Sequence, residues 1–229
     1  MKTGTGSIAV QLILLSASLP AYAQQTETRP LADFSSVAVG GGINLFLSQG
    51  DRFVVEVSSE DLADILTEVH TGTLEISRPK RGFFDWGDHG SVRVTLPSLA
   101  ALTASGGSDV ATEGSFSGDK LRLVASGGSD VVIDVSVATL DVQASGGSDV
   151  RLSGNARSAR VQSSGGSDLN ASGLMADEAD VNSSGGSDLS IGVRDKIVGN
   201  ASGGSDVSYT GDPSTVDVNS SGGSDVSRR

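Results

Sequence analysis

The chain has 229 residues, a formal net charge of −12, no cysteine and few aromatic side chains. The lack of cysteine excludes disulfides, thiolate metal sites and a lipid anchor on cysteine. The acidic balance argues against nucleic acid and anionic membranes as partners, and it favours cations or basic partners.

Residues 1–23 are predicted to be a secretory signal peptide. Lys2 supplies a positive charge, an interrupted apolar stretch follows over residues 8–19, and residues 21–23 fit a small-x-small cleavage site. The stretch is too short and too broken for a transmembrane helix, and no second apolar run of spanning length follows. We therefore expect an exported protein in the periplasm, at the cell surface or outside the cell, with no membrane span in the mature chain.

The segment 24–100 is predicted to form irregular first coils that cap one end of a repeat array. Ser59 is expected to cap one or two helical turns that follow it. Alternating apolar and polar residues predict strands at five places, over 37–39, 43–47, 53–57, 73–76 and 91–96.

A loop that contains Phe83, Phe84 and Trp86 lies between the last two of these strands. Large aromatic side chains tend to be buried, which favours an apolar plug over the end or side of the fold. The alternative is an exposed aromatic patch that contacts a partner or a glycan, and these three residues are the candidates for it.

The pentapeptide Ser-Gly-Gly-Ser-Asp is repeated seven times between residues 101 and 229, with successive copies starting 18 to 21 residues apart. The flanking residues alternate with period two, which predicts strands, and a repeat this short must stack on its neighbours to bury an apolar face. The chain is therefore predicted to be all-β, a single-stranded parallel and right-handed β-helix, or solenoid, with coils of about 19 residues. The glycine pair is expected to turn one corner of each coil.

Stacking predicts that the last residue of the pentapeptide forms a column of aspartates. If the alternation runs straight through the corner, Ser145, Gly147 and Asp149 share one outward face. Carboxylates about 4.8 Å apart repel each other by roughly 0.9 kcal/mol in water and roughly 3.5 kcal/mol at an effective dielectric constant of about 20. The column comprises Asp109, Asp130, Asp149, Asp168, Asp188, Asp206 and Asp225.

Three interpretations of this aspartate column remain open. The carboxylates could accept hydrogen bonds from nearby backbone N–H groups and fix the turn. They could bind cations, chiefly calcium, which prefers hard oxygen ligands of this kind. They could also belong to a regular recognition surface of Ser, Gly and Asp that binds a repetitive partner such as a glycan, another envelope protein or ice.

The segment Gly40-Gly41-Gly42-Ile43-Asn44 and the repeats that follow resemble the head GIN domain family, described as putative autotransporter adhesin heads. That family has repeats of the Ser-Gly-Ala-Ser-Asp type, and here the middle residue is Gly throughout. The resemblance covers essentially the whole mature chain. It implies an exported β-solenoid on or near the cell envelope, without implying a mechanism.

These observations predict a non-catalytic adhesion or interaction protein, with a calcium-binding structural solenoid as the alternative. A polysaccharide-active β-helix enzyme is a second alternative, but the column lacks a regularly placed base, and both histidines lie in the irregular first part. No cofactor other than calcium is suggested. The last coil has no atypical capping segment, so we also expect end-to-end self-association or shielding by Arg228 and Arg229.

Overall fold

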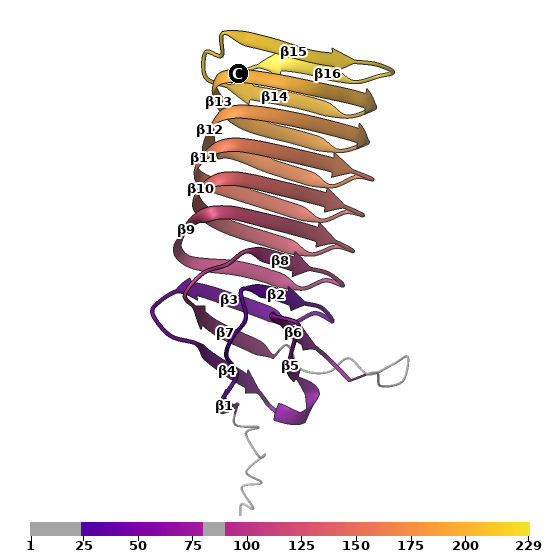
Figure 1. Cartoon of the computed structure of the whole chain (residues 1–229). Coiled ribbons are helices and arrows are strands. Elements are labelled where there is room, and N and C mark those ends of the chain that lie inside the picture. Colours follow the sequence, from indigo (N-terminus) through magenta and orange to yellow (C-terminus); the bar gives the residue numbers. More distant parts are fainter. Residues whose placement is uncertain (1–23, 80–89) are drawn as a thin grey trace, which may run out of the picture.

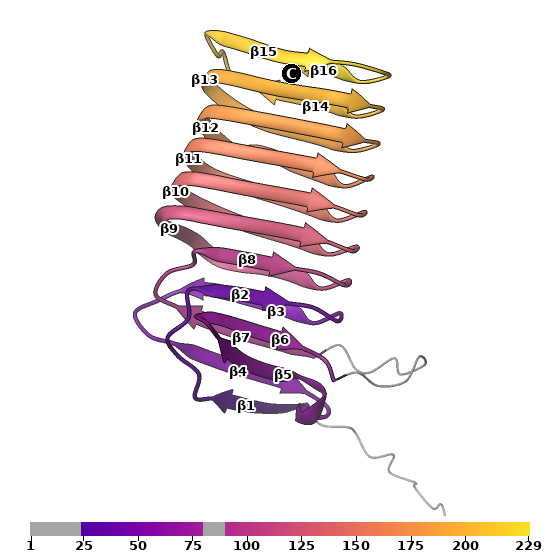
Figure 2. The same ribbon diagram turned by 45° about the vertical axis from the view of Figure 1, so that its right-hand side comes forward.

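The computed structural model describes residues 24–79 and 90–229. Their chain winds into a solenoid flattened into two layers, here called the back sheet and the front sheet after their positions in Figure 1. Five long strands each bend around one edge and contribute to both sheets (Figures 1 and 2). They are β9 (Asp109–Ser126), β10 (Asp130–Ser145), β11 (Asp149–Ser164), β12 (Asp168–Gly185) and β13 (Asp188–Gly203).

The shorter strands extend both sheets beyond these five. Neighbours in the back sheet, in order, are β1 (Gln25–Arg29), β4 (Val54–Ser59), β7 (Ser91–Leu96), β3 (Asn44–Gln49), the first halves of β9–β13, β14 (Asp206–Thr210) and β16 (Asp225–Arg228). The front sheet contains β5 (Leu66–His70), β6 (Thr73–Ser77), β2 (Ser36–Val39), β8 (Ala101–Ala104), the second halves of β9–β13 and β15 (Thr215–Ser220).

The repeat region confirms the predicted parallel β-solenoid. Each strand from β9 to β13 pairs in parallel with the next, and each aspartate of the pentapeptide lies opposite the next. Front strands run toward the pentapeptide edge and the chain returns behind them while it rises, so the coil is right-handed (Figure 1). Parallel strands joined by crossovers adopt this hand almost without exception.

A narrow apolar core fills the space between the sheets. Inward residues stack as columns, and the first of these follows the aspartates along the back sheet. Its side chains are at most 2% exposed, and burying each stabilises the fold by about 1.5–3 kcal/mol. This column comprises Val110, Val131, Val150, Leu169, Leu189 and Val207.

The glycine pair reverses the chain at the pentapeptide edge. Gly146 and Gly147 have φ angles of 67° and 74°, in the left-handed region that L-residues avoid. Both glycines are exposed, and the turn places Ser145 at the end of the front sheet and Asp149 at the start of the back sheet. The expectation that Ser145, Gly147 and Asp149 share one face is therefore wrong, because the turn separates the two faces.

The N-terminal cap departs from the parallel pattern. β1 and β4 pair antiparallel, as do β4 with β7 and β5 with β6. The predicted helical turns are a single 3₁₀ turn, η1 (Leu62–Asp64), and its cap is Asp61, which accepts a hydrogen bond from the Ala63 N–H at 3.0 Å. Ser59 was the wrong cap, because it ends β4 as a fully buried residue.

Arg29 fastens β1 to this cap. Its guanidinium donates to the carbonyl oxygens of Ile65 at 2.7 Å and Leu62 at 3.0 Å, and to Thr67 Oγ1 at 2.9 Å. A charged and largely exposed edge strand with this attachment protects the end of the solenoid from pairing with other chains. The predicted signal peptide and the aromatic candidates Phe83, Phe84 and Trp86 lie outside the described residues.

The two glycines of one pentapeptide are expected to differ in their tolerance of alanine. A Cβ on Gly203, which has a φ of 80°, would meet the backbone oxygen of Gly185 at 3.0 Å, whereas a Cβ on Gly204 would meet it at 3.8 Å without a left-handed φ. Gly203→Ala should lower the free energy of unfolding by about 1–3 kcal/mol. Gly204→Ala should leave it within about 1 kcal/mol of wild type or raise it slightly. Urea unfolding of both variants tests this, and equal losses would contradict it.

Candidate functional site: the pentapeptide edge and its aspartate column

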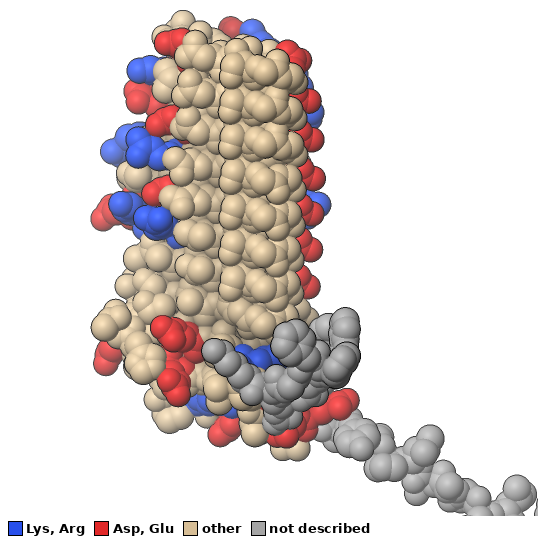
Figure 3. Space-filling model, turned by 90° about the vertical axis from the view of Figure 1, so that its right-hand side faces the viewer, with Lys and Arg blue, Asp and Glu red and all other residues tan. Residues whose placement is uncertain are grey.

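The predicted aspartate column exists in the folded chain. Each of its residues lies opposite the next across parallel strands, at the first position of the back sheet after the turn. Figure 3 shows the result as a line of acidic groups beside an edge that carries no charge. All seven side chains are exposed except that of Asp149, which is half-buried. The pairings run Asp109, Asp130, Asp149, Asp168, Asp188, Asp206 and Asp225.

The carboxylates of the column do not fix the turn. Within the described residues, one hydrogen bond reaches a carboxylate of the column: the backbone N–H of Asp225 donates to Asp206 Oδ1 at 3.2 Å. The interpretation in which every aspartate binds the backbone of its own turn is therefore wrong. The aspartates are exposed, stacked and largely without internal compensation for their repulsion.

The second serine of the pentapeptide fixes the turn instead. The Ser145 N–H donates to Ser148 Oγ at 3.1 Å, and Ser148 Oγ donates to the carbonyl oxygen of Ala125 in the preceding coil at 3.2 Å. Ser129 repeats the arrangement, accepting from Ser126 at 3.2 Å and donating to Ala104 at 3.3 Å. These serines are fully buried, so each hydroxyl closes a turn and joins two coils.

An earlier segment occupies the place of a pentapeptide in the stack. Val39 pairs with Ala104 and Leu45 with Val110, which sets Gly40-Gly41-Gly42-Ile43-Asn44 beside Ser105-Gly106-Gly107-Ser108-Asp109. Gly41 and Gly42 have positive φ angles of 81° and 70°, like the glycine pairs of the repeats. Ile43 takes the place of the buried serine, and Asn44 takes the place of the aspartate. The column therefore begins with a neutral side chain.

A groove of about 300 Å³ follows the column at the C-terminal end of the back sheet. Four column carboxylates line one side of it. The next outward column supplies the amide of Asn170 and the hydroxyls of Ser190, Ser208 and Ser227, and Arg229 lies at the end. The groove thus combines anionic and hydroxyl groups. The aspartates that line it are Asp168, Asp188, Asp206 and Asp225.

Asp134 follows the column residue Asp130 by four residues on β10, and hydrogen bonds compensate its negative charge. It lies between Ser115 and Ser153 in the neighbouring coils. Hydrogen bonds from Ser115 and Ser153, the latter at 2.6 Å, lower the pKa of Asp134 from its ordinary value despite partial burial. The column aspartates have aspartates in those neighbouring positions, so they gain no such donors.

Calcium binding by the column stays a prediction. Across residues 24–79 and 90–229, no three or more His, Cys, Asp or Glu side chains converge in a way that could hold a metal ion. The carboxylates lie in a line, so a cation between coils would meet two of them and would need further oxygen ligands. The same residues contain no helix long and apolar enough to cross a bilayer.

Comparison with known proteins adds a family and a fold. A family model described as "Putative auto-transporter adhesin, head GIN domain" matches residues 33–213. A "putative adhesin" from Bacteroides fragilis is similar in structure, with a TM-score of 0.86, 23% identity and coverage of 92% of this chain and 99% of that chain. No curated protein matches the sequence.

Two structures from Parabacteroides distasonis are also similar. One is described as a "putative lipid binding protein", with a TM-score of 0.70, 16% identity and coverage of 90% of this chain and 96% of that chain. The other is described as a "putative adhesin", with a TM-score of 0.68, 21% identity and coverage of 90% and 97%. At these identities the structures support the fold, which agrees with the solenoid described above.

Asp134→Asn is expected to destabilise the protein at neutral pH and to have less effect in acid. The folded state lowers the pKa of Asp134 below its ordinary value of 3.8. Its contribution to stability is therefore present above the ordinary value and is lost as the pH falls through the lowered one. Urea unfolding of wild type and variant from about pH 7 down to about pH 3 measures this. A difference that does not change with pH would contradict it, and the exposed Asp119→Asn serves as the control.

Proposed function

The chain belongs to the family described as putative auto-transporter adhesin, head GIN domain, and we propose that it is an exported, non-catalytic adhesion protein of the cell envelope. The family match over residues 33–213 and the solenoid fold support an adhesion role. The proposal of export rests on the signal-peptide pattern of residues 1–23, and a location in the periplasm or at the cell surface agrees with it.

The aspartate column is the observation that carries this proposal, and it is the surface that we assign to binding. Stacked carboxylates repel one another, and the described residues supply one hydrogen bond to the whole line. An arrangement that costs stability and gains so few contacts within the described residues is typical of a functional surface rather than a structural one. An external partner that brings positive charge or hydrogen-bond donors would relieve the repulsion.

The groove at the C-terminal end of the column indicates the chemistry of that partner. Its carboxylates accept hydrogen bonds, and the serine hydroxyls beside them both donate and accept. A glycan offers many hydroxyl donors, and an amine-bearing glycan or a basic envelope protein would add charge complementarity. We propose such an envelope or extracellular partner, with a glycan as the first candidate to test.

Removing charge from the column is expected to abolish binding without weakening the fold. In the triple variant Asp168→Asn, Asp188→Asn and Asp206→Asn, each side chain keeps its size and loses its charge. Binding on a glycan array and to whole cells should fall, while the thermal midpoint should stay the same or rise because repulsion is removed.

A matched control removes three exposed carboxylates elsewhere, with Asp119→Asn, Asp195→Asn and Asp217→Asn. It should bind like wild type. Binding by the column variant equal to that of wild type would reject the proposed surface. Trp86→Ala, together with Phe83→Ala and Phe84→Ala, forms a separate arm for the aromatic candidates, and a loss of binding there alone would transfer the role to them.

The calcium alternative makes a distinct prediction. If adjacent carboxylates share calcium, millimolar calcium should raise the thermal midpoint of the wild-type protein, since a ligand that binds only the folded state stabilises it. EDTA should reverse the increase, and the triple column variant should not respond. A wild-type midpoint unchanged by calcium would reject the alternative and leave the adhesion proposal intact.

A further inference from the structure

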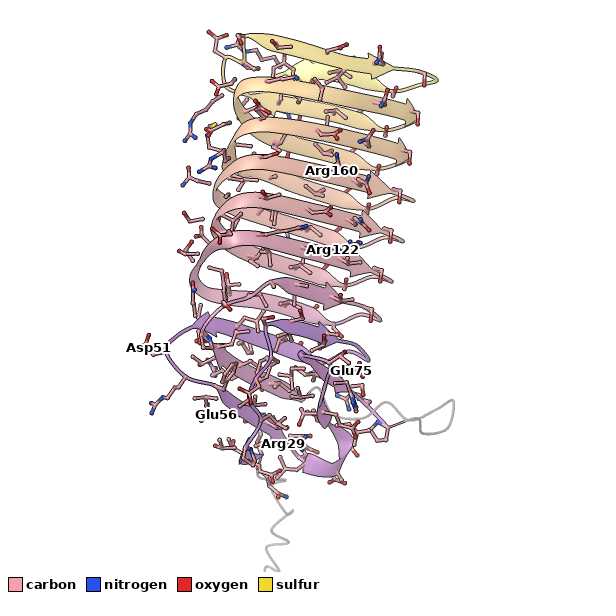
Figure 4. The ribbon with its side chains drawn as sticks, in the orientation of Figure 1. Arg29, Asp51, Glu56, Glu75, Arg122 and Arg160 are labelled. Carbon is pink, nitrogen blue, oxygen red and sulfur yellow. The ribbon has the colours of Figure 1, made fainter. Side chains whose placement is uncertain are left out.

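The front sheet carries a second outward column of charges, and this one alternates in sign. Arg122 on β9 pairs with Asp141 on β10, Asp141 with Arg160 on β11, and Arg160 with Asp180 on β12. Figure 4 shows Arg122 and Arg160 on this face, on separate strands of the stack. We call these four residues the charge ladder.

The neighbouring columns on the same four strands add charged and amide side chains to this face. On one side of the ladder, a column across the same four strands contains Lys120, Thr139, Ser158 and Glu178, and Lys196 of β13 follows Glu178. On the other side, Gln143 of β10 lies beside Gln162 of β11. The side chains of Lys120, Arg122, Arg160 and Glu178 are exposed, so this is an open sheet face.

Contacts within the chain satisfy this face only in part. Arg160 Nε lies 3.2 Å from Asp180 Oδ2. Within the described residues, this is the one ion pair between members of the ladder. Asp141, between two arginines, has a buried Oδ1 without a hydrogen-bond partner in those residues. A hollow of about 230 Å³ opens beside it, lined by Asp141, Arg160, Asp180 and Lys120 among others. A buried carboxylate oxygen without a donor is unfavourable, so the contacts of Asp141 within the chain do not fully compensate its charge.

We propose that the front sheet binds the front sheet of a second copy of this chain, related by a two-fold axis that runs parallel to the strands between β10 and β11. This rotation reverses the order of the coils and keeps each position along the strand. Asp141 then faces Arg160 of the second copy, Arg122 faces Asp180, and Lys120 faces Glu178. Each pair occurs twice, as in any isologous interface. Gln143 faces Gln162 of the second copy, and amides can hydrogen-bond to each other.

The charges favour this register over an axis through β10 and over an axis between β9 and β10. An axis through β10 itself would set Asp141 against its own copy and Arg122 against Arg160. An axis between β9 and β10 would set Arg160 opposite the neutral Ala101 of β8 and would keep one pair of the ladder. The back sheet offers no equivalent, because a two-fold axis parallel to its strands sets the column of aspartates against its own copy wherever the axis lies.

The hollow beside Asp141 gives the contact a specific centre. It lies at the step between β10 and β11, next to the proposed axis, so Arg160 of the second copy would approach Asp141 there. Exposed ion pairs are individually weak and are screened by salt. We therefore expect a dimer that forms at low ionic strength and dissociates at high ionic strength.

Charge reversal in one ladder position tests the interface by sedimentation equilibrium. Wild type should approach twice the mass of one chain at low salt, and it should return to a single mass in about 1 M salt, where the screening length is about 3 Å. Asp141→Arg sets arginine against Arg160, and Arg160→Asp sets aspartate against Asp141, so each variant alone should be monomeric. An equimolar mixture of the two should dimerise, because each supplies the charge that the other lacks.

The double variant Asp141→Arg with Arg160→Asp distinguishes an effect on the dimer interface from an effect on the stability of the folded chain. It restores opposite charges across the axis while placing like charges beside each other within the chain, and it should dimerise. Arg151→Asp on the back sheet is the control and should dimerise like wild type. If a ladder variant does not fold by circular dichroism, Lys120→Glu and Glu178→Lys provide the same single and mixed test in the adjacent column.

A wild-type protein that stays monomeric at low salt overturns the proposal. It is also overturned if the single variants dimerise as wild type does, or if their mixture stays monomeric while both are folded. Dimerisation of the singles, the mixture and the double variant alike would place the contact elsewhere on the molecule.

Discussion

Parallel stacking in register is the constraint on which the rest of the molecule depends. Adjacent coils lie about 4.8 Å apart, so every position of the repeat is multiplied into a column. An inward valine becomes part of a continuous apolar core, and a buried serine becomes a ladder of hydrogen bonds between coils. An outward residue becomes a row of identical or alternating groups. The surface chemistry of the protein is therefore decided by columns rather than by single residues.

The same stacking produces two charged columns of different kinds. On the back sheet the aspartates repeat without change, so repulsion accumulates along the line and the described residues do little to relieve it. On the front sheet Arg122, Asp141, Arg160 and Asp180 alternate, and each lies opposite a residue of the other sign in at least one neighbouring coil. The alternating column is compatible with a copy of itself, whereas the uniform column requires a partner of different chemistry. The two faces are thus suited to different interactions.

The solenoid, its coil length, the inward valines and the aspartate column all follow from local patterns, since period two and a fixed repeat are visible along the chain. The bond of the buried serine to a carbonyl of the preceding coil depends on the stack and not on neighbours in sequence. The sequence does not identify Gly40–Asn44 as a copy of the turn, because Ile43 and Asn44 stand where the repeats have serine and aspartate. β1 and β5 were missed because their side chains are largely exposed and show no apolar alternation. The charge ladder links residues about one coil apart, so a search along each strand does not reveal it.

The pairing of one coil with the next also sets rules for how the protein can change its length. A coil contacts its two neighbours, so a whole coil can be duplicated or deleted without altering the packing of the others. On the back sheet such an event lengthens or shortens the acidic line by one carboxylate and leaves its character intact. On the front sheet one added coil inverts the phase of every charge beyond it, and two added coils restore it. The two faces therefore limit the evolution of the repeat number differently. The back sheet tolerates the gain or loss of any number of coils, whereas the front sheet favours the gain or loss of two coils at a time.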